Sequence, residues 1–434
     1  ADNVDHVVGI CRHLDGIPLA LELAAARVRS MSPAQITERL AERFRLLTGS
    51  DRDQGHRQQT LLGAIQWSHD LLGDGEQALF RRLGSFASSF GLAAAEQVCS
   101  GDPIDEFDVF ELITALVDKS MVATEPGRDG TTRYHLLETL REFALRQLEL
   151  ADEHEDFAER HAAYYAMQAE ELQSMHRRGE LAAALVLLDQ VEDDYRSSLR
   201  YSMSTGRWVL AGRLVSGLGY LWYAGGLHRE GLQWCRELFE AAPELPDDVR
   251  AGALHSFGGC LSVSGFFDES IEVLEEQVVL RRKLGDPMRL MAALNNLGSV
   301  MNDVGDYVSS DPVLREAVEL AQDAGHSSAL MLGSLAVGHL HHGELAQAES
   351  LYRDALREAK AHDDVYAIAV SMGGLGQTLA WSGQTDSARV QLVEARERYE
   401  ELKVMPGLAE VDFAVAIVER TDGRPNEAAS RLLA

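Results

Sequence analysis

The sequence predicts a mainly α-helical protein with a small helical domain, a helical domain closed by a β-hairpin, and an α-solenoid of stacked helical hairpins. Apolar residues recur at helical spacing through most of the chain. In the second half, a glycine followed by a short polar turn recurs at spacings of 38 to 40 residues. Two short β-prone runs flank a turn rich in Pro, Gly and Asp near residue 127.

The composition is that of a globular protein and argues against several functions. The chain carries 69 acidic and 40 basic residues, a net charge of −29, and would repel the phosphates of a nucleic acid. The four cysteines have no CxxC spacing, which argues for reduced thiols and against a zinc site. No apolar run could span a membrane, and the start lacks a signal peptide. We expect a cytoplasmic protein with no direct contact to nucleic acid or membrane. Because Ala1 replaces an initiator Met, we also expect a fragment of a longer chain.

Residues 1–50 are expected to form the small helical domain. An apolar stripe starts at Val4, and Gly16-Ile17-Pro18 then breaks the chain before a second, very apolar helix. Ser32-Pro33-Ala34-Gln35 is a capping box with proline at the first helical position, which opens a further helix. The polar stretch 49–55 is typical of a linker.

Residues 56–150 have the element order of a winged helix. Helices are expected at Gln58–Leu71, Asp74–Ser85, Leu92–Cys99, Glu106–Asp118 and Leu137–Leu150. Between the last two, residues 121–124 and 131–136 are expected to pair as the wing. Winged helices often read DNA, but the helix before this wing has five acidic residues and one lysine, Lys119. We therefore expect a structural or switching role.

Residues 151–434 are expected to form the array of hairpins. The recurrent glycines are Gly226, Gly265, Gly305, Gly343, Gly383 and Gly423. The residue seven before and the residue five after each glycine is always Gly, Ala or Ser. Each glycine is expected to end one helix in the left-handed conformation, and the small residues let the two helices of a hairpin cross closely. Pro312 comes late in its hairpin, so the helix there is expected to start late or to kink.

The hairpin pattern resembles tetratricopeptide repeats, lengthened from about 34 to about 40 residues. A stack of such hairpins makes a concave groove, so the default function of this part is to bind a protein or peptide. A plain helical bundle is the alternative structure.

Several polar and aromatic residues are expected to be structural. His339, His341 and His342 surround a repeat turn without spaced acidic or Cys partners, so we expect solvated histidines and no metal site. His161 is expected on a helix surface, and the acidic run 192–194 on a solvated helix face. The tryptophans, Trp381 included, are expected in core or hairpin packing. No motif for a catalytic nucleophile is present.

Several segments resemble the NB-ARC-type signalling ATPases of the STAND class. Residues 11–25, which read CRHLDGIPLALELAA, resemble the segment around the GxP motif of that family. The segments that resemble its winged-helix domain are 60–61, 67–72, 76–83, 116–122 and 134–144. The likeness is greatest to large bacterial transcriptional regulators of the AfsR and LuxR/MalT type. In these proteins an NTPase domain, a helical domain, a winged helix and tetratricopeptide repeats follow one another.

The resemblance implies a nucleotide-gated switch. In the family, ADP holds a closed form, and exchange for ATP with Mg²⁺, together with an inducer, opens it to self-associate as a homo-oligomer. The resemblance implies nucleotide contacts by Gly16 and Pro18, with Pro18 packed beside the adenine. His135 would match the histidine of the MHD motif that reaches the ADP phosphate, although the residues here read Tyr134-His135-Leu136. An imidazole can donate to a phosphate oxygen. The alternatives are Pro18 as helix punctuation and His135 as an ordinary residue of the wing strand.

The phosphate-binding loop of such ATPases is missing from this sequence. It contains no GxxxxGK[ST] motif and no Gly-Lys pair, so nothing here would cradle the phosphates or hold Mg²⁺. We expect no cofactor and no catalysis by this chain, and a nucleotide-binding domain upstream. The leading hypothesis is a regulatory and sensor fragment of a nucleotide-gated transcriptional regulator, whose repeats bind a protein or inducer. The alternative is an autonomous scaffold that binds a protein partner without sensing nucleotide.

Overall fold

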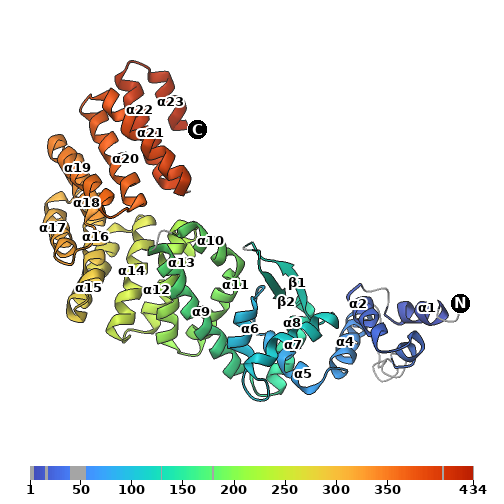
Figure 1. The fold of residues 1–434 in the computed structure, drawn as a ribbon. Coiled ribbons are helices and arrows are strands. Elements are labelled where there is room, and N and C mark those ends of the chain that lie inside the picture. The colour runs from blue at the N-terminus through green and yellow to red at the C-terminus, as the bar shows by residue number, and fades with distance from the viewer. Residues whose placement is uncertain are drawn as a thin grey trace. The chain divides into compact units, whose positions relative to one another are not determined.

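The computed structural model describes residues 4–14, 18–39, 55–128, 130–177, 180–402 and 405–433. Helices form nearly all of the regular structure, which confirms the mainly α-helical fold class (Figure 1). The contacts divide the chain into two compact units, residues 1–168 with 186–207, and residues 169–185 with 208–434. The expected linker at 49–55 lies outside the described residues except at Gly55.

The first unit holds the N-terminal helices and the winged helix. Its elements are α1 (Val4–His13), α2 (Pro18–Ala26), η1 (Arg27–Arg29), α4 (Gly55–Asp70), α5 (Asp74–Leu83), α6 (Leu92–Cys99), η2 (Glu106–Asp108), α7 (Val109–Asp118), β1 (Ala123–Pro126), β2 (Thr132–His135), α8 (Glu138–Leu150), most of α9 (His154–Arg177) and α11 (Glu192–Ser204). The expected capping box forms at the start of a further helical stretch, 33–39, where the backbone N–H of Ser32 donates to Gln35 Oε1 at 2.9 Å.

The wing is a β-hairpin with one extra bridge. Strands β1 and β2 pair antiparallel, with Ala123 opposite His135. Phe90 and Tyr134 exchange backbone hydrogen bonds of 2.8 and 2.9 Å, which adds a third strand position beside β2. The helix expected at 106–118 begins as the 3-10 turn η2 and continues as α7.

A buried carboxylate, that of Asp194, ties the winged helix to α9 and α11. Asp194 is fully buried and accepts hydrogen bonds from the backbone N–H groups of Ala87 (2.7 Å) and Ser88 (3.2 Å). Its carboxylate also lies 2.9 Å from Nε2 of His161, which is buried as well. The predictions of a solvated face for Asp194 and a surface position for His161 are therefore wrong. The backbone donors of the loop after α5 cover the carboxylate, and sequence spacing does not reveal them.

The second unit is the array of hairpins. Its elements are α12 (Trp208–Ala224), α13 (His228–Ala241), α14 (Asp247–Val263), α15 (Phe267–Leu284), α16 (Pro287–Asp303), α17 (Tyr307–Asp323), α18 (Ala329–His341), α19 (Leu345–Ala361), α20 (Val365–Trp381), α21 (Thr385–Leu402), α22 (Met405–Thr421) and α23 (Pro425–Leu433), preceded by the start of α10 (Leu181–Gln190). In each hairpin we call the even-numbered helix A and the odd-numbered helix B.

The hairpins stack in register. Each A helix from α14 onward packs against the B helix before it, its own B helix and its neighbouring A helices, as Figure 1 shows for α16 to α23. All six recurrent glycines adopt left-handed φ values between 76° and 88°, which confirms that they end the A helices. The small residues also have the expected role, because a Cβ on Gly298 would come within 2.5 Å of buried Leu314.

Pro312 does not delay its helix. Helix α17 begins at Tyr307, and Pro312 lies inside it, so the expectation of a late start is wrong. Asp306 caps the helix instead, accepting a hydrogen bond from the backbone N–H of Ser309 at 3.1 Å. The buried side chains Leu314 and Ala317 then hold the helix against the array despite the hydrogen bond that proline removes.

Replacing Gly219 with alanine is expected to destabilise the array by about 2 kcal/mol. A Cβ at this position would overlap the Ser256 side chain and lie 2.9 Å from its Cα, where α12 and α14 cross. Gly333→Ala in α18 is the control, because its Cβ would meet no atom within 4 Å and alanine favours a helix by about 1 kcal/mol. Urea unfolding followed by circular dichroism should show opposite shifts, and equal shifts would contradict the close crossing.

Candidate functional site

The A helices carry a set of partly exposed aromatic and charged side chains. Five of them form what we call the A-helix face: Tyr223, Tyr366, Trp381, Glu410 and Arg420. Tyr223 and Tyr366 are 40% and 38% exposed. Burial raises the pKa of Tyr366, and so do the nearby Tyr223 and the charge of Glu410. Side chains of α12, α20 and α22 therefore lie within electrostatic reach of one another in a half-enclosed environment.

Two carboxylates on A helices, those of Glu410 and Asp303, have no arginine or lysine beside them as a counter-ion among the described residues. Both side chains are exposed on the surface, but the atoms around them desolvate them enough to raise the pKa of Glu410 and that of Asp303, where His341 partly opposes the shift. Within the described ranges, neither carboxylate forms an ion pair with an arginine or lysine. An acidic group that is partly desolvated and unpaired is better satisfied by a cation or a hydrogen-bond donor from a partner.

Ring contacts run along the turn edge of the array. The ring of His341 stacks on Tyr307 at a centroid distance of 6.4 Å and meets Trp381 edge-on at 5.9 Å. His341 and Trp381 each stand two residues before a recurrent glycine, so the helical register itself places equivalent side chains next to each other. The same register also brings Thr421 beside Trp381 in one pocket.

The three turn histidines behave differently. His341 and His342 are exposed, as expected. His339 is not solvated as predicted, because its side chain is only 14% exposed and Nδ1 lies 2.6 Å from the Glu344 carboxylate, with Nε2 3.3 Å from Asp311. A pocket of about 140 Å³ surrounds this group. In the part of the chain that the structure describes, no three His, Cys, Asp or Glu side chains are arranged to hold a metal ion.

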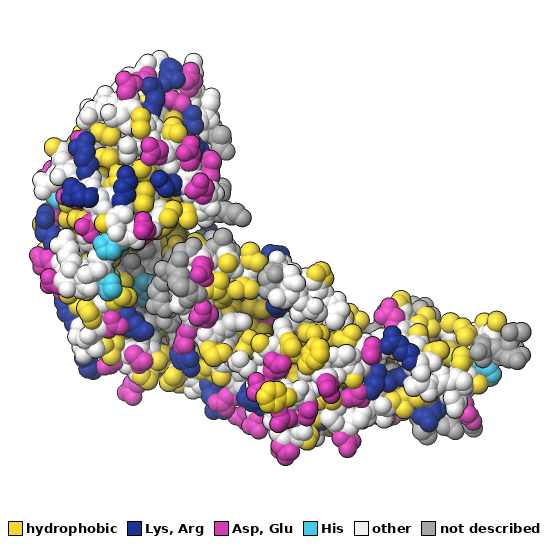
Figure 2. Space-filling model, viewed as in Figure 1, with side chains coloured by type: hydrophobic (Ala, Val, Ile, Leu, Met, Phe, Trp, Pro, Cys, Tyr) yellow, Lys and Arg dark blue, Asp and Glu magenta, His cyan; other side chains and the backbone are white. Residues whose placement is uncertain are grey.

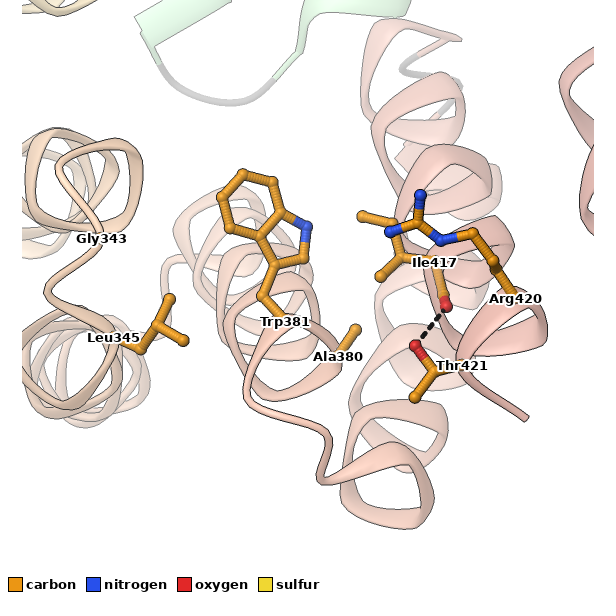
Figure 3. Close-up of a pocket in the computed structure, with 7 residues that line it drawn as sticks. All are labelled: Gly343, Leu345, Ala380, Trp381, Ile417, Arg420 and Thr421. Carbon is orange, nitrogen blue, oxygen red and sulfur yellow. Dashed lines mark hydrogen bonds between the residues drawn. The ribbon is translucent and has the colours of Figure 1, made fainter. Parts of the chain in front are cut away.

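A second pocket, of about 300 Å³, lies between the last hairpins. Figure 3 shows the Trp381 indole on one side and the Arg420 side chain on the other, with Ile417 and Thr421 between them. Trp381 is 39% exposed, so it does not lie in the core, and of the two expected placements only packing between hairpins, against His341, applies. An open indole beside a guanidinium can bind an apolar group that carries an acceptor. The position of Trp381 two residues before Gly383 was the signal that could have revealed this site.

The residues predicted to contact a nucleotide are only partly described. Gly16 lies outside the described residues, and Pro18 is exposed at the start of α2. His135 is the last residue of β2, and its Nδ1 is buried without a hydrogen-bond partner. Most buried polar atoms in proteins form a hydrogen bond, so the Nδ1 of His135 is an exception. Among the hydrogen bonds and ring contacts of the described residues, none joins Pro18 to His135.

No helix in the described residues has both the length and the apolar character needed to cross a membrane.

Comparison with known proteins identifies one domain and several relatives. Residues 72–149 match the family described as "Winged helix-turn-helix domain". Over 88% of its length this chain is 35% identical to a "Putative HTH-type transcriptional regulator" of Mycobacterium tuberculosis (strain ATCC 25618 / H37Rv), and equally to one of Mycobacterium bovis. An "Uncharacterized protein" of the same M. tuberculosis strain is 42% identical over 34% of the chain and 38% of that protein. The chain spans about half, 48%, of the length of the two regulators.

Two solved structures have a similar arrangement of elements. One is a signal transduction ATPase with numerous domains, with a tetratricopeptide repeat sensor, from Pyrococcus horikoshii. It is 13% identical with a TM-score of 0.49, and the match covers 96% of this chain and 66% of that one. The other is the apo form of RapI, 14% identical with a TM-score of 0.49, and the match covers 63% of this chain and 95% of that one.

Proposed function

We propose that this chain is the regulatory and sensor part of a nucleotide-gated transcriptional regulator. The observation that carries the proposal is the 35% identity, along 88% of the chain, to a protein named as an HTH-type transcriptional regulator. The succession of a winged helix and a hairpin array supports it. In this proposal the chain itself catalyses no reaction.

The array is the sensor in this proposal. The A-helix face offers exposed aromatic rings, an unneutralised carboxylate and a guanidinium from helices α12, α20 and α22. Protein interfaces concentrate binding energy in such aromatic and arginine side chains. A protein or inducer that binds several hairpins at once would favour one arrangement of the array and so gate self-association.

The winged helix and the N-terminal helices are the proposed contact to an upstream nucleotide-binding domain of the intact protein. Pro18 is exposed and could pack on an adenine, and the Nδ1 of His135, which is buried and has no partner here, could donate to a phosphate oxygen if the imidazole turned outward. That upstream domain would supply the phosphate loop and the Mg²⁺ site, since this sequence has neither.

Replacing His135 with alanine is expected to weaken ADP binding to the intact protein roughly tenfold, about 1.4 kcal/mol. The loss of one hydrogen bond to a charged phosphate explains this magnitude. Isothermal titration calorimetry measures it, with His326→Ala, an exposed histidine of the array, as the control. If the intact protein binds no ADP, the autonomous scaffold is the better account. If it binds ADP equally well without His135, the assignment of that residue is wrong.

A further inference from the structure

Helix α7 and the 3-10 turn η2 before it, which precede the wing, expose two phenylalanines. Phe107 in η2 is 89% exposed and Phe110 in α7 is 52% exposed, and they are three residues apart on one face. The side chains by which α7 packs into the domain are those of Val109, Ile113 and Leu116, which are buried. In Figure 2, hydrophobic and acidic side chains lie next to one another in the region where Figure 1 places α5 and α7. Large aromatic side chains so accessible on an ordered helix indicate a binding surface.

Four exposed carboxylates flank the two rings in sequence. They belong to Asp105, Glu106, Asp108 and Glu111. Asp105 also accepts a hydrogen bond from the backbone N–H of Phe107, which fixes the start of the turn. We call these four carboxylates with Phe107 and Phe110 the η2–α7 face.

The lysine that follows α7 and two arginines of the first unit each already pair with another carboxylate. Lys119, which follows α7, pairs with Glu76. Arg29 pairs with Asp118 at 2.9 Å, and Arg128 in the wing pairs with Asp189 at 2.6 Å. This face therefore presents negative charge to any partner, although in many winged helices the corresponding helix meets DNA. Phosphates would be repelled here.

We propose that the η2–α7 face docks a protein segment with apolar side chains flanked by lysine or arginine. The apolar side chains would cover Phe107 and Phe110, and the basic ones would pair with the carboxylate rim, where a guanidinium can also stack on an aromatic ring. A second copy of this chain is a poor occupant. In a twofold contact through this face, the same four carboxylates would oppose one another.

The test measures binding of a fluorescent synthetic peptide to the 434-residue chain by anisotropy. The peptide is amphipathic, with leucine and tryptophan on one side and arginines at its rim, and a second peptide has glutamate in place of each arginine. We expect the arginine peptide to bind, to weaken as salt rises, and to lose roughly tenfold or more in affinity with Phe107→Ser/Phe110→Ser. The glutamate peptide should not bind.

Two further variants distinguish binding at the η2–α7 face from non-specific attraction of a basic peptide to the acidic chain. Glu106→Gln/Glu111→Gln keeps both rings and should weaken binding and reduce its salt dependence. Leu150→Ser removes an apolar side chain that is 75% exposed at the end of α8, and should bind as the unaltered chain does. Circular dichroism checks that every variant folds.

Several results would overturn the proposal. The first is that the arginine peptide does not bind. The second is that it binds the Phe107→Ser/Phe110→Ser variant as tightly as the unaltered chain. The third is that Leu150→Ser weakens binding as much as the double phenylalanine variant does. A duplex DNA that binds through these phenylalanines would assign the face to nucleic acid instead. Self-association of the chain that disappears with Phe107→Ser/Phe110→Ser would assign it to a second copy.

Discussion

Replacing Asp194 with alanine will lower the free energy of unfolding of the first unit by about 4 kcal/mol. The change removes the acceptor of two backbone N–H groups, from Ala87 and Ser88, and the partner of buried His161. His161 stays buried and the two backbone N–H groups lie in a partly buried loop, and each unsatisfied group costs about 1–3 kcal/mol. Urea unfolding measures the loss. Hydrogen exchange should show faster exchange in α5, in the loop that follows it and in α11.

The neighbouring carboxylate provides a matched control. Asp193 is also in the first turn of α11, but its side chain is 65% exposed and pairs only with Arg196. Asp193→Ala should therefore cost less than about 1 kcal/mol. If the two alanine variants are equally stable, Asp194 does not hold the winged helix against α9 and α11.

Replacing Glu153 with glutamine will cost about 2–3 kcal/mol at neutral pH. Glu153 accepts hydrogen bonds from Arg81 (2.5 Å) and from Arg82 (3.0 Å), whose side chain is almost fully buried. Arg82 also donates to the carbonyls of Cys99, Gly101 and Asp102, so it cannot turn away to solvent. The variant leaves this buried guanidinium without its counter-ion.

The same carboxylate predicts a pH dependence. Burial alone would raise the pKa of Glu153, but the hydrogen bonds and charges of Arg81 and Arg82 outweigh burial and hold it below the ordinary value. Folding lowers the pKa of this carboxyl, so the ionised group stabilises the folded state fully when the pH is above its unfolded pKa, about 4.5. The stabilisation is lost as the pH falls from there through the lower pKa of the folded state. The difference in unfolding free energy between the two proteins should thus be constant near pH 7 and shrink below about pH 4.5.

A surface pair serves as the control for this effect. Glu138 pairs with Arg141 at 2.8 Å, but the glutamate is 66% exposed. Glu138→Gln should change the unfolding free energy by less than about 1 kcal/mol at any pH. An equal loss for the two glutamine variants would mean that the buried arginine does not depend on Glu153.

The array was predictable because its rules are local. A glycine with positive φ, such as Gly343, and a small residue where two helices cross, such as Gly298, leave a mark at fixed spacing in the chain. The wing followed from its turn and two β-prone runs, although β1 begins two residues later than expected and extends into the expected turn, to Pro126.

The buried contacts of Asp194 and the pocket beside Trp381 were not predictable in the same way. Asp194 and Asp193 are identical and adjacent in sequence, and only the loop after α5 decides which of them is buried. Trp381 was expected in core or hairpin packing, and the sequence did not show that its indole stays open beside Arg420. The nucleotide contacts of Gly16, Pro18 and His135 stay predictions, since they depend on a domain of the intact protein.

Site-specific photo-crosslinking tests the central claim, that the array recognises a partner through its A helices. A benzoylphenylalanine would replace Tyr366 or Trp381 of the A-helix face, and exposed Val279 or Val390 on the B helices α15 and α21, in the intact protein within its own cells. The account predicts one defined protein or inducer adduct from positions 366 and 381 and none from 279 and 390. Adducts from the B-helix positions alone, or from none of the four, would contradict it.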